Sequence, residues 1–267
     1  MLESRLHSVN SFVTLTYADE HLPMLKNRNL STLSPPHLRD WLKRLREKMK
    51  PSKLRYFAVG EYGDLTERPH YHVALFGVPS CLWGKSRYGR LYVDCCVNCD
   101  LIRDTWKWGH VDVGTLTHHS ATYIAGYVVK KMTSLDDERL DGRFPEFCRM
   151  SRRPGIAADA TWELASDLLQ YDVLEVDVPR ALAYGRQLLP MGRYITTLLR
   201  ERCGLGTEVP ESVKAARKEE MRPLLEIAQK SPLPQGMRLS ATVAEFYADE
   251  TLQLELKDEF YKQRKVL

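Results

Sequence analysis

Long apolar runs are missing from this sequence of 267 residues. A helix that crosses a bilayer needs about 20 consecutive, mostly apolar residues, and no run approaches that length. The first residues, MLESR, carry charges and do not open the apolar stretch of a secretory signal. We therefore expect a cytoplasmic protein that has no membrane partner.

A large excess of one charge is also missing, because the net charge is only +4. This value argues against a protein that binds nucleic acid through bulk positive charge alone. Basic residues nonetheless form two local clusters, which either hold phosphates or are ordinary solvated surface: Lys43, Arg44, Arg46, Lys48, Lys50 and Lys53, then Arg149, Arg152 and Arg153. Four aromatic residues either stack on bases of single-stranded DNA or pack in the core: Tyr88, Tyr92, Trp106 and Trp108.

Cysteine is sparse and unevenly placed. Four of the six cysteines fall within a short segment: Cys81, Cys95, Cys96 and Cys99. Thiols in a cytoplasmic protein stay reduced, and the two-residue gap between Cys96 and Cys99 is that of a zinc half-site. The segment predicts either a structural Zn²⁺ site, with His110 as a substitute ligand, or free thiols in a variable loop.

A pair of histidines stands inside a run that predicts a strand, residues 69–76 (PHYHVALF). Side chains alternate along a strand, so His70 and His72 share one face about 7 Å apart, and Tyr71 takes the other. Neutral imidazole is a good metal ligand. The pair can therefore hold a divalent ion, although two such histidines also occur by chance at surfaces or in cores.

A carboxylate joins this pair if residues 54–62 form the preceding strand. The connection at residues 63–69 is rich in turn residues, and a hairpin there brings Glu61 back beside the histidines. Two imidazoles and one carboxylate leave coordination positions open. Such a set suits Mg²⁺ or Mn²⁺ bound to a substrate phosphate.

Two tyrosines occur four residues apart in a segment that predicts a helix, residues 120–132. Tyr123 and Tyr127 then lie on one helix face, with Lys130 and Lys131 about one turn further on. A tyrosyl oxygen directed at a metal-bound phosphodiester is a nucleophile that forms a phosphotyrosine, and a lysine can help to neutralise charge on the phosphate. The alternative is that both tyrosines only pack the helix onto the sheet.

The order of these segments resembles a known family. Residues 12–17 (FVTLTY), 60–72 with GEYG and RPHYH, and 123–131 (YIAGYVVKK) look like the three motifs of the HUH endonucleases that start rolling-circle replication. The sequence is most similar to the replication initiators of Microviridae, especially gokushovirus-like phages. Residues 151–156 (SRRPGI) also resemble a segment of those proteins, and the likeness covers about residues 10 to 160.

This resemblance implies a metal-dependent nickase and a role for each candidate residue. Glu61, His70 and His72 would hold the ion, and Tyr123 and Tyr127 would be the nucleophiles, in an order that the sequence does not decide. Cleavage of a single-stranded origin would leave a 5′-phosphotyrosine and a free 3′-hydroxyl, and the circle would later be rejoined. Gly126 is a departure that lowers helix propensity by about 1 kcal/mol. It either permits close approach of DNA or the sheet, or loosens the helix.

Further expectations concern partners and alternatives. Residues 77–86 end in GKS but lack the glycine spacing of a phosphate-binding loop. Unwinding would then need a host helicase, and extension a host polymerase, in the cytoplasm of the host bacterium. The alternatives are a single-tyrosine transposase or relaxase, and a non-enzymatic, zinc-stabilised nucleic-acid-binding protein.

The predicted fold is α+β, an antiparallel sheet with packed helices, and the resemblance implies a ferredoxin-like core. Residues 1–160 would form the endonuclease domain, with a cysteine-bearing insertion at 78–100, and residues 161–267 a helical C-terminal region. The expected strands are 12–17, 54–62, 70–76 and 110–115. The expected helices are 37–50, 101–106, 120–132, 160–170, 179–189, 192–202, 208–228 and 239–262.

Overall fold

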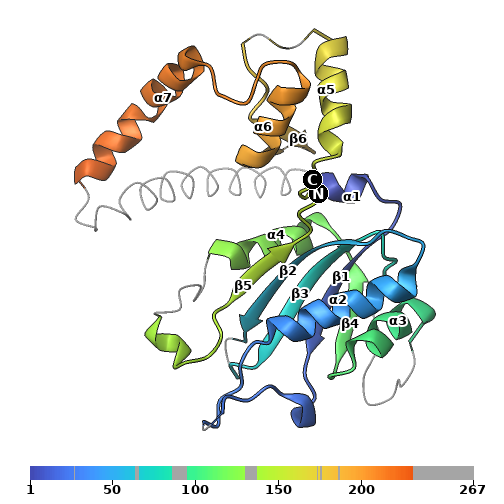
Figure 1. Cartoon of the computed structure of the whole chain (residues 1–267). Coiled ribbons are helices and arrows are strands. Elements are labelled where there is room, and N and C mark those ends of the chain that lie inside the picture. Colours follow the sequence, from blue (N-terminus) through green and yellow to red (C-terminus); the bar gives the residue numbers. More distant parts are fainter. Residues whose placement is uncertain are drawn as a thin grey trace, which may run out of the picture. The chain divides into compact units, whose positions relative to one another are not determined.

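The chain divides into two compact units, Met1–Asp167 and Leu168–Leu267, each described by itself (Figure 1). The computed structural model describes residues 1–26, 28–63, 66–85, 95–129, 137–172, 174, 176–185 and 187–230, and only the backbone of residues 127–129 and 187. The helix expected at 239–262 lies outside these residues.

The first unit is built on a five-stranded antiparallel sheet (Figure 1). Its strands are β1 (Asn10–Thr16), β2 (Arg55–Tyr62), β3 (Pro69–Phe76), β4 (Val111–Thr115) and β5 (Phe147–Met150). They lie in the order β4-β1-β3-β2-β5. The central strand, β3, therefore pairs along both of its edges.

Two long crossovers place helices α2 (Pro35–Met49) and α3 (Val97–Trp106) between strands. The order β1-α2-β2-β3-α3-β4, with the spatial order β4-β1-β3-β2, is the ferredoxin-like arrangement. The predicted α+β fold is thus confirmed. The strand β5 extends the sheet beside β2.

Helix α2 follows from its sequence pattern. Proline at the first helical positions has the backbone angle that a helix start requires, and Pro51 follows its end. Leu38, Trp41, Leu42 and Leu45 recur at helical spacing, and all four are buried. This apolar stripe packs α2 onto one face of the sheet.

The two faces of the sheet have different roles because strand side chains alternate. On β1 and β3, the core residues Val13, Leu15, Tyr71 and Val73 belong to the cluster that includes α2 and α3. Helix α4 (His118–Val129) contacts β2 and β3 and lies against the other face (Figure 1). The sheet therefore stands between a structural helix layer and α4.

Tyr71, the residue between the two histidines, is part of the structural layer. Its hydroxyl accepts from the backbone N–H of Ser34 at 2.8 Å and lies 2.9 Å from the hydroxyl of Tyr17. Burial raises the pKa of Tyr71 to about 12. The tyrosine therefore stays protonated and anchors β3 to the start of α2.

A buried carboxylate connects the N-terminal helix α1 (Leu2–Arg5) to the sheet. Glu3 is 2% exposed and accepts hydrogen bonds from Arg55 Nε and from the backbone N–H of Ala157, both at 2.5 Å. Burial opposes its ionisation, but the bonds from His7, Ala157 and Arg55 hold the pKa of Glu3 below its usual value. Arg55 also donates to the carbonyl groups of residues 154 and 155, so this network fixes the segment that follows β5.

The remaining elements include one correction. Helices α5 (Ala160–Gln170), α6 (Gly192–Arg202) and α7 (Glu211–Lys230) agree with the sequence pattern. The helix expected at 179–189 is wrong, because a two-stranded hairpin, β6 (Ala181–Tyr184) and β7 (Gln187–Pro190), stands there. Gly185, with φ +60°, lies in its turn. Two short 3₁₀ helices occur at Asp19–His21 and Glu138–Leu140, and within the described residues no helix is long and apolar enough to span a membrane.

Candidate active site

The register of the sheet brings the predicted ligands onto one face. Glu61 on β2 stands directly opposite His70 on β3, and His72 stands opposite Thr14 on β1. Residues directly opposite one another in antiparallel strands project from the same face. The hairpin expected between β2 and β3 is therefore present, and it places Glu61 beside the histidine strand.

His72 is held at both ring nitrogens. Its Nε2 lies 2.8 Å from Glu61 Oε1, and its Nδ1 lies 3.0 Å from Thr14 Oγ1. Both Glu61 and His72 are buried. An imidazole N–H donates to the carboxylate, whereas the threonine hydroxyl can donate or accept. The ring orientation is thus fixed by the neighbouring strands on each side.

His70 is bound differently. Its Nδ1 donates to the backbone carbonyl of Arg68 at 2.6 Å, which places the proton on Nδ1 and leaves Nε2 with a lone pair. An N–H bonded to a carbonyl is the usual support of a metal-ligating histidine. The ligand atoms of Glu61, His70 and His72 are nevertheless not gathered into one compact group.

Tyr123 lies beside His72. Its ring meets the imidazole edge-on, with centroids 5.2 Å apart, and meets Phe12 edge-on at 6.3 Å. Phe12 in turn stacks parallel to His72 at 5.9 Å. Ile124 is buried and anchors this part of α4, whereas 43% of Tyr123 is exposed. One predicted nucleophile is therefore next to the Glu61–His72 pair and accessible from outside.

The other predicted catalytic residues are less fully described. The backbone of Tyr127 belongs to α4, but its side chain, Lys130 and Lys131 lie outside the described residues. A Cβ added at Gly126 would have no described atom within 4 Å. Close approach of the sheet therefore does not account for this glycine.

Two residues of the site had no assigned role in the sequence interpretation, Phe12 and Thr14. Both belong to the FVTLTY segment, which the sequence interpretation used only as part of a family motif. Alternation along the strand places residues 12 and 14 on one face of β1. That signal could have identified them once the pairing of β1 with β3 was known, but the sequence does not state this pairing.

The first basic cluster of the sequence belongs largely to the opposite side of the sheet. It lies mostly on α2, which packs in the structural layer. Arg44 donates from Nε to the carbonyl of Thr105 and stands over the Trp108 ring. Trp106 is fully buried, and Trp108 also stacks with His37 at 4.3 Å. These aromatic side chains pack within the protein, and Tyr88 and Tyr92 lie outside the described residues.

Four cysteines form a separate group, here called the cysteine cluster: Cys81, Cys95, Cys96 and Cys99. Their sulfur atoms all lie within 4.8 Å of one another, an arrangement that could bind a metal. His110 is not part of this group. Burial raises the pKa of the Cys81 and Cys99 thiols. Burial has the same effect at Cys96, but backbone N–H groups outweigh it and lower the pKa of Cys96 to about 7.

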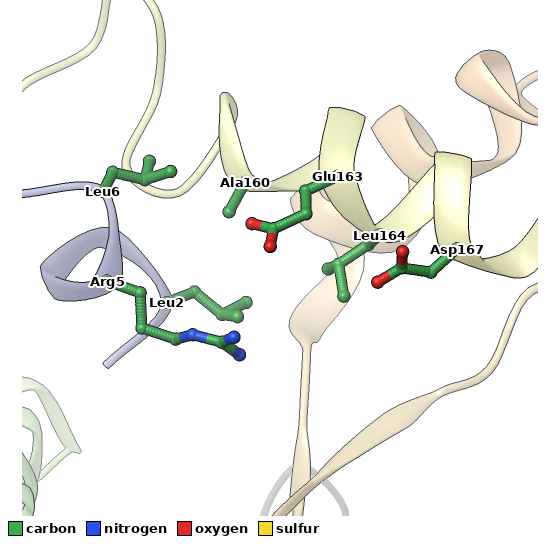
Figure 2. Close-up of a pocket in the computed structure, with 7 residues that line it drawn as sticks. All are labelled: Leu2, Arg5, Leu6, Ala160, Glu163, Leu164 and Asp167. Atoms are coloured by element: carbon green, nitrogen blue, oxygen red, sulfur yellow. The ribbon is translucent and has the colours of Figure 1, made fainter.

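A small pocket lies between α1 and α5, away from the predicted site (Figure 2). The carboxylates of Glu163 and Asp167 line it on the α5 side, and Arg5 lines it on the α1 side. Its volume is about 50 Å³, far below the roughly 300 Å³ of the smallest ordinary ligand pockets. No residue of the Glu61–His72–Tyr123 site lines it.

Known proteins match the part of the chain that contains this site. Residues 10–132 match a family model of replication-associated proteins of the ORF2 type. The replication-associated protein VP4 of Bdellovibrio phage phiMH2K is 35% identical over 147 residues, which cover 52% of this chain and 44% of that protein. The replication-associated protein ORF2 of Spiroplasma virus 4 is 35% identical over 150 residues, 55% of this chain and 46% of that protein.

A third relative, the replication-associated protein ORF4 of Chlamydia phage 1, is 32% identical over 151 residues, 53% of this chain and 36% of that protein. The resemblance to replication-associated proteins of Microviridae phages is thereby confirmed. The chain spans less than half the length of these relatives in the matched regions. No solved structure matches the chain.

Proposed function

We propose that this protein is a replication-initiation endonuclease that nicks single-stranded origin DNA with a tyrosine nucleophile. The observation that carries the proposal is the position of Tyr123. It is partly exposed, and its ring lies against His72, whose imidazole contacts the buried carboxylate of Glu61. A nucleophile and a pair of metal-ligand types meet within the segment that matches replication-associated proteins.

The donor set fits a hard divalent ion. One carboxylate and one or two imidazoles are ligands that Mn²⁺ and Mg²⁺ accept, with positions left for phosphate oxygens and water. Glu61 and His72 would hold the ion, and His70 would join them through Nε2, because its Nδ1 is engaged with the Arg68 carbonyl. When bound, Mg²⁺ or Mn²⁺ neutralises charge on the phosphate during the displacement.

The chemistry is a direct displacement at phosphorus. The Tyr123 oxygen attacks, a tyrosyl O–P bond forms, and the bond from phosphorus to the 3′ oxygen breaks. The phenolic proton passes to water, which the exposure of Tyr123 allows, and the departing 3′ oxygen takes up a proton. The products are a 5′-phosphotyrosine and a free 3′-hydroxyl.

Rejoining is the reverse displacement. A 3′-hydroxyl attacks the phosphotyrosine, the tyrosyl O–P bond breaks, and the phenol regains its proton. The covalent intermediate retains the energy of the phosphodiester, so this step requires no ATP. Tyr127, on the same helix, would act as the second nucleophile when the replicated circle returns, and Lys130 and Lys131 would neutralise charge on the phosphate.

The reaction defines the partners. The protein would bind single-stranded or unpaired origin DNA in the cytoplasm of the host bacterium. A host polymerase would extend the free 3′-hydroxyl, and a host helicase would open the duplex ahead of it. The exposed residues Arg149, Arg152 and Arg153, which lie at and just after β5, are candidates for contact with DNA phosphates.

A covalent-adduct assay tests this proposal. The full chain is incubated with labelled single-stranded oligonucleotides that tile the replicon encoding it, with Mn²⁺ or with EDTA, and the products are separated on a denaturing gel. We expect a protein–DNA band in Mn²⁺ and none in EDTA. Tyr123→Phe should reduce the first-strand adduct at least tenfold, and the double change with Tyr127→Phe should abolish it.

A matched control removes a hydroxyl elsewhere. Tyr171 is 70% exposed and far along the chain from α4, so Tyr171→Phe should form the adduct at the normal rate. If the wild type forms no adduct on any tile but still binds DNA equally well in EDTA, the nickase proposal is wrong. That result would instead support a non-enzymatic nucleic-acid-binding protein. A Mn²⁺-dependent adduct that persists in the double variant would place the nucleophile elsewhere.

A further inference from the structure

We infer that the cysteine cluster binds one Zn²⁺ ion and forms a structural centre at the end of the sheet. This centre is independent of the proposed nicking chemistry. Four sulfur atoms meet in it, two from buried and two from half-buried residues. A site made of four thiolates is typical of structural zinc.

The sulfur spacing is that of a single tetrahedral ion. Zinc–sulfur bonds measure about 2.3 Å, and the edge of a tetrahedron is about 1.6 times its radius, so the ligand atoms should stand roughly 3.8 Å apart. The sulfur atom of Cys81 lies 3.6 Å from that of Cys95 and 4.0 Å from that of Cys96. A disulfide would require about 2.05 Å.

The backbone around Cys81 supports a metal-bound sulfur. The N–H of Trp83 points at the Cys81 sulfur at 3.4 Å, and the N–H of Gly84 donates to the Cys81 carbonyl at 3.0 Å. Gly84 has φ +79°, a conformation that favours glycine. The result is a tight Cys-x-x-Gly turn that presents one sulfur and stabilises its negative charge.

The other three ligands surround the start of α3. Cys96 immediately precedes the helix, and Cys99 lies in its first turn. The side chain of Asn98 donates to the carbonyl of Ser80 at 2.7 Å, which ties this turn to the chain that leaves β3. The predicted start of this helix at residue 101 was therefore too late, because the cysteine pair is part of the helix start.

The position of the centre indicates support and not catalysis. Cys81 and Cys99 belong to the hydrophobic core shared with α2 and α3, on the face of the sheet opposite to His72. Four protein ligands also leave no open position for a substrate. Through α3 the centre reaches the sheet, because the Trp106 indole donates to the Thr16 carbonyl on β1 at 2.8 Å.

The first test uses the full wild-type chain, purified without chelators. Elemental analysis should find about one zinc per chain. Titration with an organomercurial in the presence of a zinc-binding dye should release that zinc as four thiols react. Replacement by Co²⁺ should give the visible absorption of a tetrahedral site together with a thiolate charge-transfer band.

Variants then assign the ligands. Cys99→Ser should lose at least nine tenths of the bound zinc and unfold at a lower temperature. Cys203→Ser, which removes a cysteine outside the cluster, should keep the full zinc content. The wild-type mercurial titration decides the matter if Cys99→Ser does not fold.

Three results would overturn the inference. The first is a wild-type chain that contains no zinc and whose cluster thiols react freely. The second is iron in place of zinc at one ion per chain. The third is full zinc content with an unchanged Co²⁺ spectrum in Cys99→Ser. None of these readouts depends on DNA cleavage, so failure of the zinc centre and failure of the nickase proposal are distinguishable.

Discussion

Replacement of Thr14 by valine isolates the hydroxyl group that contacts His72. Valine has nearly the same shape and keeps the β-branched side chain that suits a strand. The change therefore removes the 3.0 Å contact with His72 Nδ1 and little else. His72 is 7% exposed, and loss of a partner at a buried polar atom costs about 1–3 kcal/mol of stability.

The same hydroxyl matters for the proposed ion. With an ion on Nε2, the proton of His72 must be on Nδ1, and Thr14 accepts it. Without an ion, Nε2 donates to Glu61, and Thr14 can donate to Nδ1. A hydroxyl serves both states and a methyl group serves neither. Loss of such a supporting contact typically weakens metal binding about 10- to 100-fold.

Two measurements and one control test this reasoning. Mn²⁺ affinity is measured by electron paramagnetic resonance without DNA, and stability by urea unfolding. Thr14→Ser keeps the hydroxyl but loses a methyl group, at a cost of about 0.8 kcal/mol. It should therefore lose some stability but bind Mn²⁺ nearly as the wild type does. Wild-type affinity and wild-type stability in Thr14→Val would refute the assigned role of Thr14.

The remaining predictions concern α4 and the N-terminal network. Gly126→Ala should raise the unfolding free energy by about 1 kcal/mol, because the added methyl group meets no described atom; a lower thermal midpoint would contradict this. Its adduct yield, measured in parallel, should fall only if DNA approaches this position closely. Glu3→Gln should lower stability near pH 7 by about 3–5 kcal/mol, because it leaves Arg55 without its buried partner. Since the folded-state pKa of Glu3 is lowered, this contribution is present above the ordinary value of 4.5 and is lost as the pH falls below it. Urea unfolding at several pH values should therefore show the gap between wild type and variant narrowing in acid, and a gap that widens there would contradict the prediction.

Periodicity was enough to predict the sheet that holds the site. The alternation in residues 69–76 and the turn residues before them predicted a hairpin, and the register Glu61–His70 is its consequence. The sequence could not predict that β1 pairs with the other edge of β3, because that pairing joins segments more than fifty residues apart. Thr14 was consequently missed as a partner of His72.

Other differences have local causes. Residues 181–190 contain alanine and leucine, which favour helices, yet the turn at Gly185 folds them into a hairpin. The basic residues of α2 precede the ligand strands in the sequence, but the crossover carries the helix to the opposite face. The proximity of the four sulfur atoms likewise depends on tertiary structure, because Cys81 is separated from the other three by the segment before α3.

The site joins two parts of the fold with different mechanical properties. The ligand strand β3 is hydrogen-bonded to β1 and β2 along its whole length, so any shift of His72 relative to its neighbours would break directional bonds. Tyr123 meets the sheet through ring contacts with Phe12 and His72, which change gradually with displacement. Amide hydrogen exchange should therefore be slowest in β3. A rigid sheet below a helix that can slide is a suitable arrangement for an enzyme that must present two tyrosines in turn to one phosphate.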